Sequence, residues 1–421
     1  MDYLTTVVIA CSLAYTLMLF VTSRRRQPPR PAAPDGLFFV FLVPCLNEEL
    51  VIGRSLDRLL AIPASNFAVM VIDDGSDDAT PEIVRRYDPD RVWLFRREPP
   101  EARQGKGHAL NAAYRRLRDD ALAAGRDPDD IVVVVVDADG RIEPGALLEV
   151  APYFADPRTG AVQIGVRMYN AGEKLLTRMQ DFEFVTFTEV FQRARQRIGS
   201  VGLGGNGQFN RLSALMALGD APWTDCLTED LDLGVRLLAA GWANSFCPTT
   251  FVSQQAVTSL PRLLRQRARW FQGHLQCWRR IPLILRSDLS ARSSIDLVYH
   301  LTSPFLVLIM SLVTLVFLVG AIALALDAHL GAAQVPAHDS LALMGLLYVV
   351  TFGLAPVYGF TYWLHDRPTN LAKAILLGHL FHLYAYLWFP AGWMAVWRVI
   401  RRRRNWAKTA RTVEAPEASA S

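Results

Sequence analysis

The chain has 421 residues, of which 51% are hydrophobic and 20% are charged. This composition is too apolar for a purely soluble enzyme and too charged for a pure bundle of membrane helices, and the length allows a domain of ~150–250 residues plus several membrane helices. A net charge of +4 is too small to indicate nucleic-acid binding, and five cysteines without a Cys-x-x-Cys pair support neither a disulfide framework nor a zinc site.

The N-terminus, residues 1–23, is predicted to be a transmembrane helix. Residues 2–22 are almost uninterrupted apolar sequence of the length that a bilayer span requires. This segment is too long for a typical signal-peptide core, and no small-residue cleavage site precedes Arg24–Arg26. The positive-inside rule therefore puts the N-terminus outside and these arginines in the cytoplasm. A basic, Pro-rich linker at 24–36 follows.

Residues 37–260 form one predicted domain, in which apolar runs alternate with helical patterns up to Pro144 and the pattern becomes less regular after it. The predicted strands are Leu37–Pro44, Val69–Ile72, Val92–Phe95, Ile131–Val136 and Ala161–Met168. The predicted helices are Glu48–Ala61, Thr80–Tyr87, Gly107–Ala124, Leu175–Arg197 and Asp230–Ala240, and Gly202–Arg211 is predicted to be a Gly-rich loop leading into a short helix. Such alternation predicts a Rossmann-like α/β domain with a mostly parallel sheet and covered faces.

The remainder of the chain is predicted to lie on and in the membrane. Residues 261–295 are predicted interface helices because Pro261–Arg280 is rich in arginine and aromatic residues. Residues 296–400 form the predicted transmembrane region, and 401–421 a basic tail. The segments long and apolar enough to cross are Leu301–Leu326, Leu341–Trp363 and Ala372–Ile400, the last interrupted by His379, His382 and Pro390.

The charges near the C-terminus conflict with three crossings. If all three segments cross, Arg401–Arg404 lie outside, whereas the positive-inside rule prefers them inside. Either one segment does not cross fully or the rule fails here. The histidines of this region, among them His300, serve either a polar pathway or hydrogen bonds between helices.

Two acidic clusters follow predicted strands, where ligands bind in parallel sheets. Asp137 and Asp139 come after a valine-rich strand, and two such carboxylates suit a hard cation such as Mg²⁺ or Mn²⁺. The alternative is a solvated turn. Asp73 and Asp74 follow another strand and are able to accept hydrogen bonds from a base or ribose, with helix capping as the alternative role for this loop. Lys106, between two glycines, supplies a charge for a phosphate or ribose.

Two further motifs lie in the second half of the domain. Asp230 is the candidate general base, although an acid at this position also suits the first turn of a helix. Arg269 suits a diphosphate leaving group, and Trp270 offers a flat face to a sugar ring. The alternative is an interfacial helix, where Arg and Trp are common. Neither a P-loop nor a Gly-x-Ser-x-Gly nucleophile elbow is present in the sequence.

Taken together, these motifs resemble the membrane-embedded family 2 glycosyltransferases, which include the cellulose, hyaluronan, chitin and poly-N-acetylglucosamine synthases. The resemblance covers roughly residues 37–275. It rests on six motifs in the family's order: Pro44-x-x-Asn47-Glu48, Asp73-Asp74-Gly75-Ser76, Gly105-Lys106-Gly107, Asp137-x-Asp139, Thr228-Glu229-Asp230 and Gln266-x-x-Arg269-Trp270. The last motif is typical of processive synthases.

The resemblance implies a cytosolic GT-A domain, a UDP-sugar donor and a Mg²⁺ or Mn²⁺ ion. It assigns the metal to Asp139 and Asp137, and the catalytic set to Asp230, Glu229 and Arg269. The nucleotide site it implies comprises Pro44, Asn47, Glu48, Asp73, Asp74, Lys106, Asp137, Gln266 and Arg269. The acceptor site it implies comprises Gly205, Asn206, Gly207 and Trp270. The loop Gly204–Gln208 departs from those of the cellulose and hyaluronan enzymes, so their sugars do not carry over.

We therefore expect an inverting hexosyltransferase of the inner or plasma membrane, multi-pass, with its catalytic domain in the cytoplasm. The leading hypothesis is polymerisation of a UDP-activated sugar into a β-linked polysaccharide that passes through the membrane helices. The alternative is a single transfer to a lipid acceptor, and the small number of membrane helices also leaves room for an export partner. A non-catalytic transporter or scaffold is disfavoured by the intact Asp137, Asp139 and Asp230.

Overall fold

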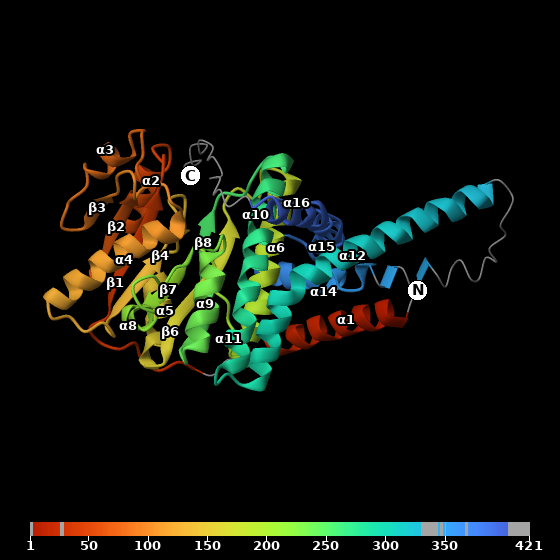
Figure 1. The fold of residues 1–421 in the computed structure, drawn as a ribbon, viewed down its shortest axis with the longest axis horizontal. Coiled ribbons are helices and arrows are strands. Elements are labelled where there is room, and N and C mark those ends of the chain that lie inside the picture. Colours follow the sequence, from red (N-terminus) through yellow and green to blue (C-terminus); the bar gives the residue numbers. More distant parts are fainter. Residues whose placement is uncertain are drawn as a thin grey trace.

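A computed structural model describes residues 3–25, 29–329, 344–345, 348–349, 351–366 and 369–402. The strands gather at one end of the molecule, and the long helices α1 (Tyr3–Ser23) and α12 (Ala291–His329) extend from the other (Figure 1). Helices α6 (Leu175–Thr186) and α10 (Leu260–Gln276) lie between them. Part of the predicted span Leu341–Trp363 and nearly all of the predicted tail 401–421 lie outside the described residues.

The described residues form an eight-stranded mixed sheet in the order β3-β2-β1-β4-β7-β6-β8-β5. Strands β3, β2, β1 and β4 are parallel, β7 runs antiparallel to both β4 and β6, β6 and β8 are parallel, and β5 is antiparallel to β8. The strands are β1 (Phe38–Cys45), β2 (Phe67–Asp73), β3 (Val92–Arg96), β4 (Ile131–Val135), β5 (Arg141–Ile142), β6 (Thr159–Met168), β7 (Gln208–Arg211) and β8 (Ala243–Gln254).

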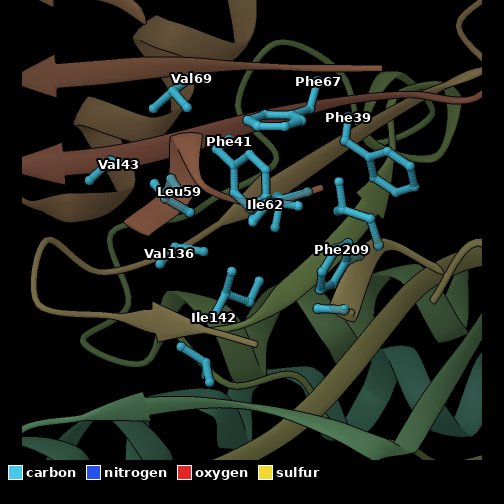
Figure 2. Close-up of a cluster of buried hydrophobic side chains, with 14 of the residues drawn as sticks. Phe39, Phe41, Val43, Leu59, Ile62, Phe67, Val69, Val136, Ile142 and Phe209 are labelled. Atoms are coloured by element: carbon cyan, nitrogen blue, oxygen red, sulfur yellow. The ribbon is translucent and has the colours of Figure 1, made fainter. Parts of the chain in front are cut away.

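The sheet is buried on both faces, which explains the continuous apolar runs of its central strands. Along β1, Phe39, Phe41 and Val43 enter one core cluster, whereas Val40 and Leu42 enter the cluster on the opposite face. Figure 2 shows the first cluster, where the β1 side chains meet aromatic and aliphatic side chains of the neighbouring strands.

Helices cover the sheet and connect its strands. They are α2 (Ile52–Leu60), α3 (Thr80–Val84), α4 (Lys106–Ala123), α5 (Ala146–Val150), η1 (Ala151–Ala155), α8 (Leu212–Met216) and α9 (Glu229–Ala239). The predicted helix Leu175–Arg197 is a continuous run of α6 (Leu175–Thr186), the π-helical η2 (Phe187–Gln192) and α7 (Arg193–Ile198). A π-helical turn inside a helix is frequent at functional sites.

The parallel sheet predicted from the alternation before Pro144 is confirmed for β1 to β4, and the rest of the domain adds the antiparallel strands β5 and β7. Strand β7 occupies the end of the stretch predicted as a Gly-rich loop. Its polar side chains are buried and form hydrogen bonds. Gln208 donates to the Gly204 carbonyl at 3.0 Å, and Asn210 donates to the Val133 carbonyl at 3.3 Å. Tertiary pairing, rather than apolar periodicity, makes this segment a strand.

The second half of the chain is helical: α10 (Leu260–Gln276), η3 (Cys277–Arg280), α11 (Ile281–Arg286), α12 (Ala291–His329), α14 (Ala355–His365), α15 (Leu371–Ala385) and α16 (Trp388–Ile400). Among the residues that the structure describes, two helical stretches, Ala291–Gly320 and Leu371–Ile400, are long and apolar enough to cross a membrane by length and composition. The second is divided by turn residues between α15 and α16. Helix α16 packs along α10, where Phe271 meets Gly392 and the Arg398 Nε donates to Gln272 at 2.8 Å.

Candidate active site

A cavity of about 580 Å³ lies between the carboxyl ends of the central strands and the helices α10, α12 and α16. Both predicted acidic clusters and both predicted helical motifs reach it. Of the residues predicted from the sequence, those that line the cavity are Pro44, Glu48, Asp74, Lys106, Asp137, Gly205, Asn206, Glu229, Asp230, Gln266, Arg269 and Trp270.

Four predicted residues, Asn47, Asp73, Asp139 and Gly207, are not on the cavity wall. Asp73 is fully buried, and its Oδ1 accepts a hydrogen bond from the Ser76 amide at 2.9 Å. The Asn47 side chain exchanges hydrogen bonds with Asp77. Asn47 therefore joins the loop after β1 to the loop after β2, and Asp73 holds the start of the second loop. Their direct contact with a nucleotide stays a prediction, as does a role of Gly207 with the acceptor.

Lys106 joins three segments of the site. Its Nζ lies 2.7 Å from Asp137 Oδ1, 2.7 Å from the Gly205 carbonyl oxygen and 3.9 Å from Glu229 Oε1. Burial by itself lowers the pKa of Lys106, but the negative charges of Asp137 and Glu229 outweigh burial, so the pKa is raised and the amine stays charged. A single cation therefore holds together carboxylates that would otherwise repel one another.

Glu229 and Asp230 open helix α9 as a pair of buried carboxylates. Burial, together with the negative charge of Asp230, raises the pKa of Glu229 to about 7 against the opposing effect of Lys106. Burial also raises the pKa of Asp230, but the Leu231 amide donates to its Oδ1 at 2.9 Å and favours the charged form. Within the pair, Asp230 is thus the better holder of negative charge.

The backbone at Gly205 leaves room for these groups. A Cβ atom at this position would lie 3.2 Å from Asp230 Oδ2 and 3.3 Å from Lys106 Nζ. Any side chain larger than hydrogen would therefore crowd both the candidate base and its counter-ion.

We expect the Glu229→Gln variant to be more stable than the wild type above neutral pH. The pKa of Glu229 is raised from 4.5 to about 7 on folding, so its contribution to stability is fully present below pH 4.5 and is lost as the pH rises to 7. Glutamine does not titrate, so the variant should gain ~2–3 kcal/mol relative to wild type between these pH values. Thermal unfolding from pH 4 to 8 measures this, and a difference independent of pH would contradict the assignment.

Helix α10 carries the second half of the site. Its backbone packs directly against the segment before α9: a Cβ on Gly273 would lie 2.6 Å from the Thr228 amide nitrogen. The Leu227 amide also donates to Gln276 Oε1 at 2.9 Å. The position of Asp230 is therefore set by α10, the helix that bears Arg269 and Trp270.

A buried ion pair missed from the sequence holds Trp270 in place. Arg267 is buried, pairs with Glu183, and places its guanidinium carbon 4.2 Å from the centre of the Trp270 ring. The Tyr384 hydroxyl donates to Glu183 Oε2 at 2.9 Å, and the Trp388 indole donates to Oε1 at 3.0 Å. The available signal was a charged residue at position 183 between the apolar residues of α6.

The two acids after β4 provide oxygen ligands of the kind that Mg²⁺ and Mn²⁺ prefer. Asp137 lines the cavity. Asp139, two residues later, is buried, and its Oδ2 accepts a hydrogen bond from the Gln255 amide at 3.2 Å. Within the described residues, no group of three or more His, Cys, Asp or Glu side chains is arranged to hold a metal. This donor set fits an ion that takes its other ligands from a diphosphate and water.

Comparisons with known proteins identify sequence relatives among glycosyltransferases. Residues 34–273 match the family model described as "Glycosyltransferase like family 2". The chain is 32% identical over 281 residues to the beta-monoglucosyldiacylglycerol synthase of Trichormus variabilis, covering 64% of this chain and 56% of that protein. It is 27% identical over 236 residues to the poly-beta-1,6-N-acetyl-D-glucosamine synthase of Staphylococcus aureus, covering 55% and 53%. It thus spans about half the length of these curated relatives.

A solved structure extends the likeness to most of the chain. The mannosyltransferase PcManGT from Pyrobaculum calidifontis, in complex with GDP-Man and Mn²⁺, superposes with a TM-score of 0.61 at 22% identity, covering 94% of this chain and 97% of that one. At this identity the likeness shows the fold, and it confirms the predicted GT-A-like architecture.

Proposed function

Because this chain belongs to the family 2 glycosyltransferases, we propose that it transfers a single sugar from a nucleotide-sugar donor to a lipid acceptor at a membrane surface. The observation that carries the proposal is the continuity of the cavity, which joins the acidic cluster at the sheet edge to α10 and the apolar helix α12. The relative with 32% identity is named for a lipid product, which supports single transfer over the polymerisation predicted first.

Polymerisation is the second candidate function. The 27%-identical relative is named as a polysaccharide synthase, and the Gln266-x-x-Arg269-Trp270 motif on α10 resembles that of processive enzymes. Both candidates use the same donor site and differ in what occupies the acceptor side of the cavity.

In the proposed reaction, the acceptor hydroxyl attacks the anomeric carbon as its proton passes to Asp230, which inverts the configuration in one displacement. Lys106 and Arg269, both on the cavity wall, offset the negative charge that develops on the diphosphate. The Trp270 ring, held by Arg267, orients the acceptor. Asp137 and Asp139 would hold a divalent ion, which when bound neutralises the diphosphate leaving group.

For the placement in the membrane, we propose that α12 crosses it and that α16 lies along the interface. Helix α16 has 13 residues, fewer than the ~20 that a span needs, and it packs on α10. Tryptophans and arginines at its end, such as Trp397 and Arg401, suit the interfacial region. We further propose that the predicted span Leu341–Trp363 returns the chain to the cytoplasmic side. Two crossings then leave the basic residues after 400 on that side, and the conflict with the positive-inside rule disappears.

The function is tested with the full chain in nanodiscs, supplied with Mn²⁺ and, in turn, UDP-glucose, UDP-N-acetylglucosamine and GDP-mannose. Product size separates the two candidates: a lipid bearing one added sugar supports single transfer, whereas long glycosidase-sensitive chains support polymerisation. Absence of transfer from every donor to every lipid offered would overturn both.

We expect chelation to abolish sugar transfer and Asp139→Asn to weaken metal binding. Replacing one of two charged ligands removes a hard donor, so the affinity for Mn²⁺ should fall by about 10–100-fold. Binding of Mn²⁺ in the presence of UDP, followed by electron paramagnetic resonance, measures this without turnover. Asp156→Asn, at a partly exposed bend away from the cavity, serves as the control. Unchanged Mn²⁺ affinity in Asp139→Asn would refute the metal assignment.

A further inference from the structure

Pro304 interrupts the hydrogen bonding of α12 at the inner end of the cavity. Proline has no amide hydrogen, so the carbonyl of His300, four residues earlier, loses its partner within the helix. Two side chains replace that partner: His274 Nε2 lies 2.8 Å from the His300 oxygen, and the Ser303 hydroxyl donates to it at 2.7 Å. The indole of Trp278 donates to the next carbonyl, that of Leu301, at 2.6 Å. The proline thus fixes α10 against α12.

This contact determines the hydrogen-bonding state of His274. A carbonyl oxygen only accepts, so Nε2 must carry the hydrogen. Burial lowers the pKa of His274 to about 4, so the imidazole is neutral at physiological pH and its Nδ1 is a hydrogen-bond acceptor. Within the part of the chain that the structure describes, no hydrogen bond reaches Nδ1, although the side chain is half-buried and lines the cavity.

His274 lies one helical turn beyond Trp270 on the same face of α10. Gly273, its neighbour, touches Thr228, so the inner part of the cavity begins close to the segment that carries Asp230. A molecule lying on the Trp270 ring therefore has the candidate base on one side and the Nδ1 acceptor further along the helix.

The inner half of the cavity does not suit an anion. Its walls are apolar, and its polar groups are uncharged or acidic. The residues that define it are Phe184, Phe271, His274, Ser303, Val307 and Trp388. Among the described residues, the cationic side chains that line the whole cavity are Lys106 and Arg269, and both interact with the acidic cluster. A phosphate brought to the inner half would be desolvated without a partner.

We propose that the inner half of the cavity binds an uncharged headgroup with at least two hydroxyls, such as a sugar already attached to a lipid, and that Nδ1 of His274 accepts a hydrogen bond from the second hydroxyl. The proposal rests on the proposed glycosyl transfer, because the first hydroxyl is the one that Asp230 deprotonates. The ring of such a headgroup stacks on Trp270. His274 is thus a specificity-determining residue for the acceptor.

Two substitutions distinguish a role of His274 in lipid recognition from a role in protein stability. Each replaces the function of one of the two imidazole nitrogens and removes that of the other. His274→Gln retains a donor at the position of Nε2 and lacks an acceptor at Nδ1, whereas His274→Asn retains an acceptor near Nδ1 and loses the bond to the His300 carbonyl. We expect His274→Gln to keep its melting temperature and to weaken glycolipid binding by about 10-fold, the effect of one lost hydrogen bond. We expect His274→Asn to bind the glycolipid normally and to melt at a lower temperature.

Binding is measured with the full chain in detergent, without donor, using three lipids with the same acyl chains: monoglucosyl-diacylglycerol, diacylglycerol and phosphatidic acid. The expected order has the glycolipid tightest, with the preference over diacylglycerol lost in His274→Gln. The reverse pattern in the two variants, or a preference for phosphatidic acid, would overturn the proposal. If the wild type binds the glycolipid but transfers no sugar to any lipid, the proposed function fails while this site stands. If it transfers sugar but does not prefer the glycolipid, this site fails alone.

Discussion

Replacement of Asp230 by asparagine is expected to lower the rate of sugar transfer by about 10²–10⁴-fold, the usual contribution of a general base. Asparagine keeps the shape of the side chain but cannot accept the proton of the attacking hydroxyl. The Leu231 amide, which favours the charged form of Asp230, and the backbone space at Gly205 remain in the variant. The affinity for the nucleotide should therefore change little.

The measurement is single-turnover sugar transfer, with nucleotide binding determined separately. Asp225→Asn is the matched control, since it makes the same chemical change on an exposed side chain five residues earlier. Glu229→Gln identifies which acid of the pair accepts the proton. If Asp230→Asn retains the wild-type rate while Glu229→Gln loses it, Glu229 is the base.

Introduction of one methyl group at Gly273 is expected to lower kcat/KM by about 10²-fold, because a displacement of ~1 Å at a catalytic group has effects of this size. The new Cβ would lie 2.6 Å from the Thr228 nitrogen and 2.7 Å from its Cγ2. The nearest contact is backbone, so the clash cannot be relieved by rotation of a side chain. Helix α10 and the start of α9 must separate, which displaces Asp230 relative to Arg269.

Overpacking of this kind should also lower the free energy of unfolding by about 1–3 kcal/mol. Gly145→Ala is the control, because a Cβ at Gly145 meets no atom within 4 Å. Kinetics and thermal unfolding of both variants provide the comparison. A Gly273→Ala variant with wild-type kcat/KM would show that α10 does not set the position of the base.

Strands β1 to β4 of the first half of the domain could be predicted from the sequence, whereas strands β7 and β8 of the second half could not. Strands β1, β2 and β4 are buried on both faces, so their apolar runs are visible in the sequence. Strand β7 consists of Gln208-Phe209-Asn210-Arg211 and is buried through hydrogen bonds, which leave no periodic signal. Strand β8 was missed for a different reason: it contains Pro248, and its pairing to β6 shifts register, so its sequence lacks a regular alternation.

The same distinction applies to the site. Asp137, Lys106 and Asp230 belong to short motifs, and the structure brings the two acids to the amine of Lys106. Arg267 and His274 have no motif. Their roles depend on Glu183, on helix α6, and on the carbonyl that Pro304 frees in α12. Partners that are distant in the chain cannot be inferred from spacing.

The ion pair between Glu183 and Arg267 has a consequence for protein production. Its partners Tyr384 and Trp388 come from the C-terminal helices. A soluble fragment that ends before α10 would keep Glu183 but lose every one of these partners, and would expose an apolar wall beside an uncompensated carboxylate. Such a fragment is therefore expected to aggregate. The full chain, purified in detergent or lipid, is the better material for structural and functional work.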